Sequence, residues 1–548
     1  MPHAILNLPA ISPTANPDFR DAAACAKWLE SLPLINVGPT HGRLLSEIEE
    51  LNCCEISPAE RLRILELLHE PVVFVQLEQA KKFANRAVPL AKPEREILLG
   101  VVALWGALGS GYQHCLQAFS GVSASLLAGS GQMELACQRA LWCAAQQINE
   151  HHRCYQDISG EDWEQLHQLY LFAEEHQLVN AQVAHPLQKE EWKTTCMETY
   201  VQALLLQLAN PCEYTSRQLG LISRWLDRWG EVARLTHSYT DPGGDKPAPV
   251  LAADLGGDKE PCQLEPNDAS RTLKGTWRYL DVAALSKNVR ERVASLKKGL
   301  APTLLNLGDD VPAPLAEYLL AQLQYQWCEV KSARAPGRKS TPGEADLATT
   351  MGAMHYYITA RPFRQPGDNR ELSKAQREEI ATFGRVSTHT EDKHATQHGF
   401  ALERWLIQEE SLAGMRLQRK DGPARFIHTQ LIAARPSDAR TFMLGTVRWL
   451  KVDGNYAPTL SVRAMPGVPQ GIAIRATGLN AMTDKYIPAL LLSAVPALRS
   501  PETLVLPVGW FRPKRVIEVY SDQVRQLALD SVIDRGSDFE RVTFQAGA

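Results

Sequence analysis

The spacing of apolar residues changes near position 237, and this change limits the possible folds more than any other feature of the sequence. Before it, apolar residues recur every three or four positions, as Leu62, Leu65 and Leu68 do, which is the period of an amphipathic helix. Well after it, short apolar runs are separated by Gly and Pro, as strands and turns are. A chain of 548 residues also exceeds a single domain of roughly 150 residues. The sequence therefore predicts an α+β multidomain protein.

Residues 1–236 predict an all-α helical domain. Two helix starts are well marked: Ser57 is followed three residues later by Glu60, and Ser159 is followed three residues later by Asp162. A Ser side chain before a helix accepts a hydrogen bond from the third backbone N–H, and an acidic residue at that third position can return one. We therefore expect helices to begin directly after these two serines.

The segments beyond residue 236 predict four further parts. Residues 237–270 are rich in Gly, Pro, Asp and Lys without an apolar period, so they predict a flexible linker. Residues 271–330 predict a helical lead-in. Residues 331–478 predict a small β-barrel with an insertion near 365–400, and residues 479–548 predict a C-terminal β-rich segment.

The clearest strands lie in the predicted barrel. Met443–Leu450 and Thr459–Arg463 have strand-like composition, and Asp453–Asn455 between them has the composition of a tight turn. Short strands separated by Gly and Pro favour a small barrel over a parallel sheet.

The charge balance limits the partners of the chain. Lys and Arg number 58 and Asp and Glu 62, so the net charge is −4. A broad binding surface for a nucleic acid polymer needs an excess of basic residues, so we expect no nucleic acid polymer as a partner. A small basic pocket for a charged ligand is compatible with this balance.

Cysteine usage and hydropathy predict the compartment. The 11 Cys are irregularly spaced, which is typical of reduced thiols rather than of a disulfide framework. No Lys or Arg precedes Arg20, so the start of the chain does not resemble a signal peptide. The most apolar stretches, Ile97–Leu108 and Ile487–Leu498, are shorter than the ~20 residues that span a bilayer. We predict a cytoplasmic protein without a transmembrane segment.

The familiar catalytic motifs are absent from the sequence. It contains no phosphate-binding G-x-x-x-x-G-K-[ST] loop, no G-x-S-x-G nucleophile elbow and no H-E-x-x-H metal motif. His151, His152 and Cys154 carry metal-binding side chains, but neighbouring residues on a helix point in different directions and no second ligand pair accompanies them. We interpret this run as an exposed helix end. The chain is predicted not to be an enzyme, with no catalytic residue, metal or cofactor.

Two short motifs in the β half carry the functional prediction. Arg334 and Arg338 form an R-x-x-x-R pattern in a Pro- and Gly-containing loop before a strand-like run. Glu409, Ser411 and Gly414 form an acidic-x-Ser-x-x-Gly pattern that leads into another strand. In this order, the motifs resemble those of the PilZ family of cyclic di-GMP receptors. That family has R-x-x-x-R in the loop entering a small six-stranded barrel, then (D/N)-x-S-x-x-G on the barrel surface.

The resemblance covers about Trp327–Thr477 and implies a PilZ-like β-barrel with cyclic di-GMP as its ligand. Guanidinium groups bind phosphate oxygens in pairs and stack on planar bases, so the two arginines of the first motif would hold the ligand. The carboxylate of Glu409 would accept hydrogen bonds from a guanine edge. The short side chain of Ser411 and the missing one at Gly414 would let a base lie close to the strand edge.

Two alternatives stay open at this point. Arg361 and Arg364 are a second pair of arginines, spaced R-x-x-R and closer in sequence to Ser411. In addition, Glu409 stands where the family has Asp or Asn, and the two motifs are separated by about 70 residues, more than the family usually has. Both departures favour a rival hypothesis, in which the chain is a scaffold or adaptor whose degenerate barrel binds no nucleotide.

The preferred hypothesis is a bacterial, cyclic di-GMP-responsive effector that acts in signalling. The barrel would bind the nucleotide, and the helical domain would bind an unidentified protein partner. Binding would order the arginine loop and change the relative orientation of the two halves.

Overall fold

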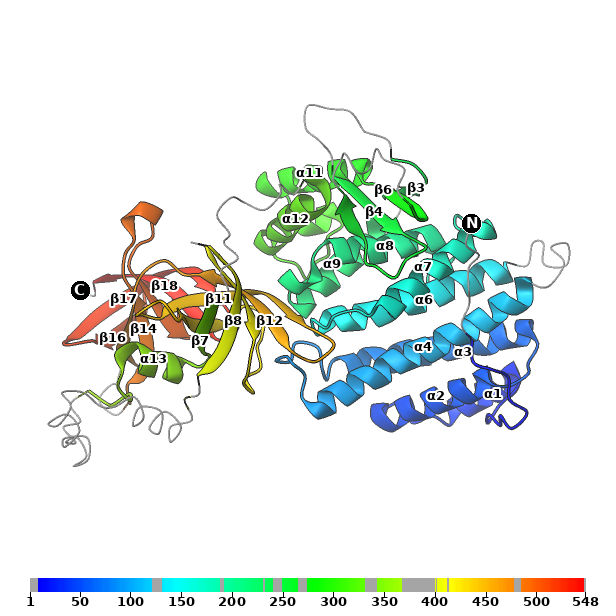
Figure 1. Ribbon diagram of the computed structural model, residues 1–548, viewed down its shortest axis with the longest axis horizontal. Coiled ribbons are helices and arrows are strands. Elements are labelled where there is room, and N and C mark those ends of the chain that lie inside the picture. Colours follow the sequence, from blue (N-terminus) through cyan, green and yellow to red (C-terminus); the bar gives the residue numbers. More distant parts are fainter. Residues whose placement is uncertain are drawn as a thin grey trace. The chain divides into compact units, whose positions relative to one another are not determined.

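The computed structural model describes residues 8–120, 131–187, 192–229, 232–239, 249–264, 274–330, 343–366, 400, 402–411, 413–477 and 484–546. Its contacts divide the chain into two compact units (Figure 1). One unit comprises Met1–Arg86 and Leu90–Arg334, and we call it the helical unit. The other comprises Ala87–Pro89 and Ala335–Ala548, and we call it the β unit. The predicted α+β multidomain class is confirmed.

Helices make up most of the helical unit, and the two predicted helix starts are confirmed. Ser57 Oγ accepts a hydrogen bond from the backbone N–H of Glu60 at 3.4 Å. Ser159 Oγ accepts one from Asp162 N at 3.1 Å, and Asp162 Oδ2 accepts one from Ser159 N at 3.2 Å. The helices are α1 (Ala22–Glu30), α2 (Val37–Asn52), α3 (Pro58–Ala80), α4 (Lys92–Ser120), α6 (Gln132–Arg153), α7 (Gly160–Glu175), α8 (Cys196–Leu208), α9 (Ser216–Trp229), α11 (Ala283–Lys297) and α12 (Ala313–Cys328), with 3-10 turns η1 (Pro211–Glu213) and η3 (Pro302–Leu305).

The long helices α3, α4 and α6 lie side by side in this unit (Figure 1). Two glycines of α4 allow the close packing. A Cβ at Gly111 would lie 2.8 Å from Leu65 Cδ2 of α3, and one at Gly109 would lie 3.1 Å from Cys143 Cβ of α6. Neither neighbour leaves room for a larger residue, so glycine is required where the helices approach most closely.

Strands also occur in the helical unit, which corrects the predicted all-α domain and flexible linker. Val250–Asp254 and Cys262–Leu264, inside the predicted linker 237–270, form β4 and β5. The apolar run at 250–253 is buried in a sheet, so the described part of this segment is not an extended linker, while residues 240–248 and 265–270 of the predicted linker lie outside the described part of the chain. The strands are β1 (Val183–Ala184) paired with β2 (Lys193–Thr194), and a four-stranded sheet in the order β3 (Arg234–Thr236), β6 (Trp277–Asp281), β4, β5.

The boundary between the units therefore falls later than predicted. The predicted helical lead-in, residues 271–330, contains β6, α11 and α12 and belongs to the helical unit. Trp327 of α12 explains this placement, because it is fully buried and its Nε1 donates a hydrogen bond to Leu205 O of α8 at 2.9 Å. The lead-in is thus part of the core of the helical unit and not a connection to the barrel.

The β unit begins with a closed antiparallel barrel of six strands, in the region predicted to be a barrel. In the ring, the strand order is β7-β8-β9-β12-β11-β10, and β10 pairs with β7 to close it. The insertion predicted near 365–400 falls between α13 (Met351–Thr359) and β8, and residues 367–399 lie outside the described part of the chain. The strands are β7 (Gly343–Ala348), β8 (Glu403–Ser411), β9 (Gly414–Arg419), β10 (Leu431–Pro436), β11 (Met443–Val452) and β12 (Pro458–Ala464).

A second closed barrel of six strands follows, where only a β-rich segment was predicted. It begins before residue 479, because Pro469–Ala476, predicted as part of the first barrel, is its first strand. Its ring order is β13-β14-β15-β18-β17-β16. The strands are β13 (Pro469–Ala476), β14 (Ile487–Leu492), β15 (Thr503–Pro507), β16 (Val516–Tyr520), β17 (Val524–Arg535) and β18 (Phe539–Ala546), with 3-10 turn η4 (Pro496–Leu498).

The two barrels share one hydrophobic core. Leu431 and Leu444 from the first barrel and Leu490 and Val505 from the second belong to one cluster of buried side chains. Met354 of α13 is part of the same cluster. A separate cluster fills the second barrel and does not include these residues. The barrels therefore pack outer face against outer face within one unit.

Two further predictions concern membrane-spanning helices and the state of the cysteines. Among the described residues, no helix is both long enough and apolar enough to cross a lipid bilayer. All eleven cysteines are free thiols, and most of them are buried.

Candidate functional site

The predicted ligand-binding residues fall into two groups. Arg334 and Arg338 lie outside the described residues, in the segment 331–342 directly before β7. Glu409, Ser411 and Gly414 lie together at the hairpin between β8 and β9, on the first barrel. The second group therefore defines the part of the site that the structure describes.

The hairpin is closed by Ser411 and Gly414. The two residues pair directly, and Ser411 Oγ donates a hydrogen bond to Gly414 O at 3.2 Å. Gly414 has a φ of 150°, and a Cβ at this position would collide with the carbonyl oxygen of Val462 on β12. Glycine is required because the backbones of β9 and β12 approach closely here.

One row of side chains crosses four strands on the outside of the barrel. Glu409 of β8 pairs with Arg416 of β9, Arg416 with Ser461 of β12, and Ser461 with Trp449 of β11. The register shift between Ile407 and Glu409 places the acid opposite Arg416. The guanidinium of Arg416 lies 4.6 Å from the centre of the Trp449 ring, since the small Ser461 between them leaves room.

A second row runs beside the first. Ser411 pairs with Gly414, and Gly414 pairs with Arg463 of β12, whose side chain is exposed. The backbone at Gly414 is thus bordered by Ser411 on one side and Arg463 on the other. We call this surface the hairpin face. Its members are Glu409, Ser411, Gly414, Arg416, Trp449, Ser461 and Arg463.

Two arginines of the hairpin face, Arg416 and Arg463, have no ion pair with an acidic residue of the described part of the chain, whereas some other arginines of the β unit do. Arg435 pairs with Asp346 at 2.8 Å and Arg448 with Asp534 at 3.2 Å. Among the described residues, no ion pair satisfies Arg416 or Arg463, and the Nε of Arg416 is buried without a hydrogen-bond acceptor. Two guanidinium groups that have no acidic partner in the described part of the chain lie beside the backbone of Gly414. Such a surface is suited to an anion that also has a planar part.

Arg416, Trp449 and Arg463 were not predicted from the sequence. Arg416 stands two residues after Gly414, so strand alternation would have placed it on the same face. Trp449 and Arg463 lie within the strands that were predicted, but their proximity depends on which strands pair. The alternative pair, Arg361 and Arg364, follows α13.

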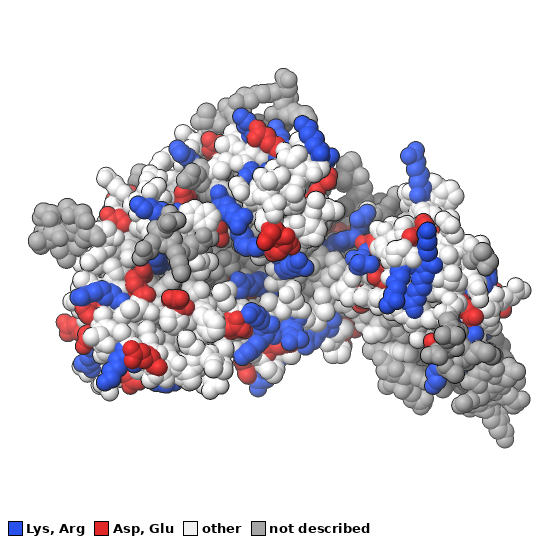
Figure 2. Space-filling model, turned by 180° about the vertical axis from the view of Figure 1, so that it is seen from behind, with Lys and Arg blue, Asp and Glu red and all other residues white. Residues whose placement is uncertain are grey.

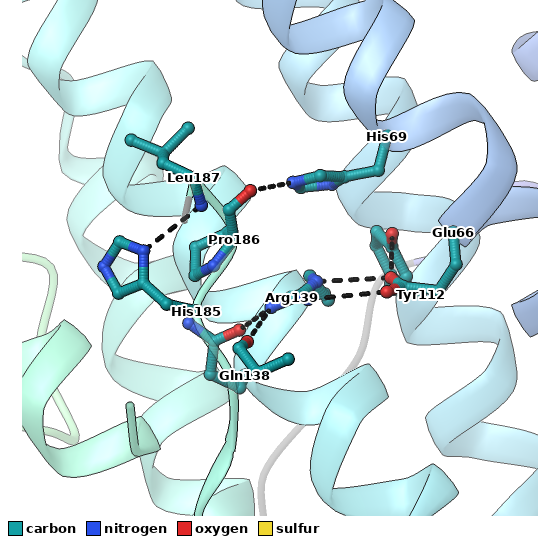
Figure 3. Close-up of polar contacts among 9 residues, drawn as sticks. Glu66, His69, Tyr112, Gln138, Arg139, His185, Pro186 and Leu187 are labelled. Atoms are coloured by element: carbon teal, nitrogen blue, oxygen red, sulfur yellow. Dashed lines mark hydrogen bonds and ion pairs between the residues drawn. The ribbon is translucent and has the colours of Figure 1, made fainter. Parts of the chain in front are cut away.

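The helical unit contains a buried polar cluster around Arg139 of α6 (Figure 3). Arg139 is 4% exposed and pairs with Glu66 of α3 at 3.2 Å. It also donates to Ala184 O at 2.9 Å, while Tyr112 of α4 donates to Glu66 Oε1 at 2.7 Å. Burial raises the pKa of Tyr112, so its hydroxyl stays protonated and donates. Since every strong donor here has an acceptor within the cluster, its role is to join α3, α4 and α6 to the chain at Ala184.

A second contact fixes the same stretch of chain. His69 Nε2 lies 3.1 Å from Pro186 O (Figure 3). Burial lowers the pKa of His69 to about 4, so the ring is neutral near pH 7 and its Nε2–H donates to that carbonyl. The carbonyls of Ala184 and Pro186 are therefore both held by side chains from the helices.

The possible metal ligands do not form a metal site. Among the described residues, no group of three or more His, Cys, Asp and Glu side chains is placed to hold a metal ion. The predicted exposed helix end at His151–Cys154 is wrong in one respect: His152 is 5% and Cys154 2% exposed, because this end of α6 is covered by neighbouring elements.

The charged side chains on the face of the helical unit in Figure 2 include both signs side by side.

Comparison with known proteins identifies a class of receptor that the chain resembles. Residues 23–241 match the family model described as "Cyclic-di-GMP receptor FimW, N-terminal domain". Residues 472–546 match the model "FimW C-terminal beta-barrel domain". The second match coincides with β13–β18, whereas the first barrel with the hairpin face lies between the two matched ranges.

One similar protein aligns over nearly the whole chain. It is "Cyclic-di-GMP receptor FimW" of Pseudomonas aeruginosa (strain PAO1), 23% identical over 549 residues that cover 92% of this chain and 87% of that protein. Among solved structures, "MrkH, A novel c-di-GMP dependence transcription regulatory factor" aligns with 40% of this chain and 91% of that chain at 9% identity. Its TM-score of 0.12 is too low to define a shared arrangement of the two chains.

Proposed function

We propose that the hairpin face of the first barrel binds cyclic di-GMP, and that the chain is a cyclic di-GMP-responsive effector. The observation that carries the proposal is a pair of arginines without acidic partners among the described residues: Arg463, beside Gly414 on β12, and Arg416, two residues after Gly414 on β9. The name of the similar Pseudomonas aeruginosa receptor supports the choice of ligand. The PilZ-like order of the two sequence motifs supports the choice of barrel.

Each side chain has a role that follows from the chemistry of the ligand. Cyclic di-GMP carries two phosphates and two guanines. Arg416 and Arg463 donate to phosphate oxygens, and the outer side of the Arg416 plane offers a stacking surface for a guanine. Glu409 accepts hydrogen bonds from a guanine edge. Arg334 and Arg338, which precede β7 in sequence, complete the phosphate clamp over this face.

The wider roles are part of the same proposal. The chain acts in the cytoplasm without catalysing a reaction, and the helical unit binds a protein partner that responds to the occupancy of the barrel. The net charge of −4 supports the view that a nucleic acid polymer is not that partner.

Calorimetric titration of the full chain with cyclic di-GMP tests the proposal. Arg416→Ala should weaken binding by about 1.5 to 3 kcal/mol, or roughly ten- to a hundredfold, because a charged hydrogen-bond donor is lost. The matched control is Arg404→Gln, which removes an exposed charge near the other end of β8 and should leave affinity unchanged. Equal losses in both variants would indicate a general charge effect and contradict a specific site.

Two further variants test the predicted motifs. Arg334→Ala with Arg338→Ala should abolish binding if these residues clamp the phosphates. Glu409→Asp should tighten it, because Asp is the residue of the PilZ motif at this position and a carboxylate on a shorter stem suits a close guanine contact.

The rival function is a scaffold whose barrel binds no nucleotide, and one observation favours it. Ser411 Oγ already donates to Gly414 O, so the hairpin is complete without a ligand. Absence of heat from the wild-type chain, together with retained partner binding by the double arginine variant, would establish the scaffold and refute the receptor.

A further inference from the structure

The helical unit contains a cavity of about 220 Å³ among α3, α4, α6, α8 and α9. Its apolar walls include Trp105 of α4, Trp142 of α6 and Leu206 of α8. This space is many times that of a single water, so it accommodates a compact organic group. Gly220 of α9 also lines it and is exposed, and a Cβ there would meet no atom within 4 Å. The cavity therefore has an open mouth at Gly220.

One acidic side chain lines this cavity, and no described residue pairs with it. Asp227 lies in the last turn of α9, where the helix dipole also disfavours a negative charge. Two arginines line the same cavity, but each has an acidic partner. Arg153 pairs with Glu150 at 3.1 Å and Arg224 with Asp310 at 2.8 Å. Among the described residues, Asp227 is therefore the charged side chain of the cavity wall that has no counter-ion.

A buried hydrogen-bonding atom accompanies this acid. His152 of α6 lines the cavity and is 5% exposed, and its Nε2 has no hydrogen-bond partner. Burial lowers the pKa of His152 to about 3, so the ring is neutral near pH 7 and can accept a hydrogen bond. Gln202 of α8 donates through its amide nitrogen to Leu226 O at 3.4 Å, which leaves its carbonyl oxygen as a further acceptor. The polar part of the wall is rich in acceptors.

The Arg139 cluster lies next to one part of the cavity wall. Arg139 and His69 hold the carbonyls of Ala184 and Pro186, and the next residue, Leu187, lines the cavity with half of its surface exposed (Figure 3). The Arg139 cluster and His69 thus anchor the chain directly before an apolar residue of the wall.

We propose that this cavity binds a monovalent organic cation on a short apolar stem, an alkylguanidinium or alkylammonium group, with Asp227 as its counter-ion. The stem packs against Trp142 and Leu206, and the N–H groups donate to Asp227 and His152. An anion is disfavoured by Asp227, and a neutral apolar group would leave that carboxylate desolvated without a partner. The proposal concerns the helical unit and is independent of nucleotide binding by the barrel.

Titration of the full chain with n-butylguanidinium, followed by saturation-transfer NMR, tests the proposal. A ligand of this size that uses both the stem and the charge should saturate the site with a dissociation constant of about 1 mM at pH 7. Absence of saturation up to about ten times that concentration overturns the proposal.

Three variants locate the binding. Asp227→Asn should weaken it at least about tenfold, because the counter-ion is lost. Gly220→Leu should abolish it by filling the mouth, and it favours the helical conformation of α9, so folding is not at risk. The control is Glu164→Gln, which removes an exposed acid of α7 and should leave affinity unchanged. Wild-type affinity in either of the first two variants overturns the proposal.

The pH profile gives an independent readout. Burial raises the pKa of Asp227 to about 6, while Arg228 beside it acts in the opposite direction. Arg224 and Arg153 are the other charged groups in the wall, and His152, whose pKa burial lowers to about 3, stays neutral between pH 5 and 7. Affinity should therefore fall about tenfold from pH 7 to pH 5 as the carboxylate protonates. A flat profile contradicts the role of Asp227.

A second probe distinguishes an arginine side chain of a protein partner from a free small cation. The capped peptide acetyl-Leu-Arg-Leu-amide carries the same guanidinium on a polypeptide. Tighter binding of the peptide than of n-butylguanidinium, by about tenfold, assigns the cavity to an arginine side chain of a protein partner. Equal or weaker binding of the peptide assigns it to a free small cation, and failure of both probes refutes the site.

Discussion

The two barrels of the β unit have the same strand order but use the same part of their surface differently. If the strands of each barrel are numbered one to six along the chain, both rings read 1-2-3-6-5-4, and all neighbours are antiparallel. In the first barrel, the outer face of strands 2, 3 and 6 carries Glu409, Arg416 and Arg463. In the second barrel, the outer face of the same strands carries Leu490, Val505 and other apolar residues that pack against the first barrel.

The shared strand order therefore does not determine which surface of a barrel can bind a ligand. The turn between strands 2 and 3 has two residues in the first barrel and ten in the second, and β14 and β15 have no charged residue. A ligand face requires polar side chains that remain open to solvent, whereas an interface requires apolar ones that do not. The chain therefore uses one barrel surface for a candidate site and the equivalent surface for assembly of the unit.

The largest expected effect comes from truncating the interface. Leu490→Ala removes a fully buried side chain from the core between the barrels, and should lower the free energy of unfolding of the β unit by about 2 to 4 kcal/mol. Leu406→Ala is the matched control, because Leu406 faces outward from strand 2 of the first barrel and is 40% exposed. Its cost should stay within about 0.5 kcal/mol. Chemical denaturation measures both, and similar costs would contradict the different use of the two faces.

A smaller loss is expected at the tight turn that the second barrel lacks. Gly414→Ala forces a Cβ against the carbonyl of Val462 at a φ of 150°, so it should cost about 1 to 3 kcal/mol and also weaken nucleotide binding. Gly454→Ala in the turn between β11 and β12 is the control, since a Cβ there meets no atom within 4 Å. If the thermal midpoints of the two variants fall equally, the close approach of β9 and β12 is not what requires glycine.

The local parts of this architecture could be predicted from the sequence. The caps at Ser57 and Ser159 are contained in four consecutive residues each, and both helices begin where predicted. The hairpin of β11 and β12 was likewise predicted from strand-like composition on both sides of a short turn. Such features depend on neighbours in the sequence, so a single chain is enough to find them.

The second barrel could not be predicted in full in the same way, because β14 does not alternate between apolar and polar residues. Ile487–Leu492 is an uninterrupted apolar run, since one side of β14 faces the barrel interior and the other faces the first barrel. Such a run has no period of two and is equally compatible with a buried helix. The linker prediction failed for a related reason, because β4 and β5 are too short to show a pattern.

The candidate site was predictable only in part. Glu409, Ser411 and Gly414 were found because they are close in sequence, and their role in binding remains a prediction. Arg416, Ser461 and Trp449 form one row only after β9, β12 and β11 pair, and strand pairing across such separations is not encoded in a local pattern.

The smallest expected effect is at a single acid that joins the barrels. Asp538, directly before β18, accepts a hydrogen bond from the backbone N–H of Leu431 of β10 at 2.8 Å, and burial raises its pKa. An Asp whose pKa is raised on folding destabilises the folded state when it is ionised. Asp538→Asn retains an acceptor oxygen, so it should raise the free energy of unfolding at pH 7 by less than about 1 kcal/mol.

As the pH falls toward the ordinary Asp range near 4, the wild-type carboxyl protonates and this gain should disappear. Thermal unfolding of both proteins from pH 7 to pH 4 measures the difference. If the variant is less stable than the wild type at pH 7, the ionised carboxylate strengthens the contact between the barrels. The interface between the barrels would then depend on a charge as well as on apolar packing.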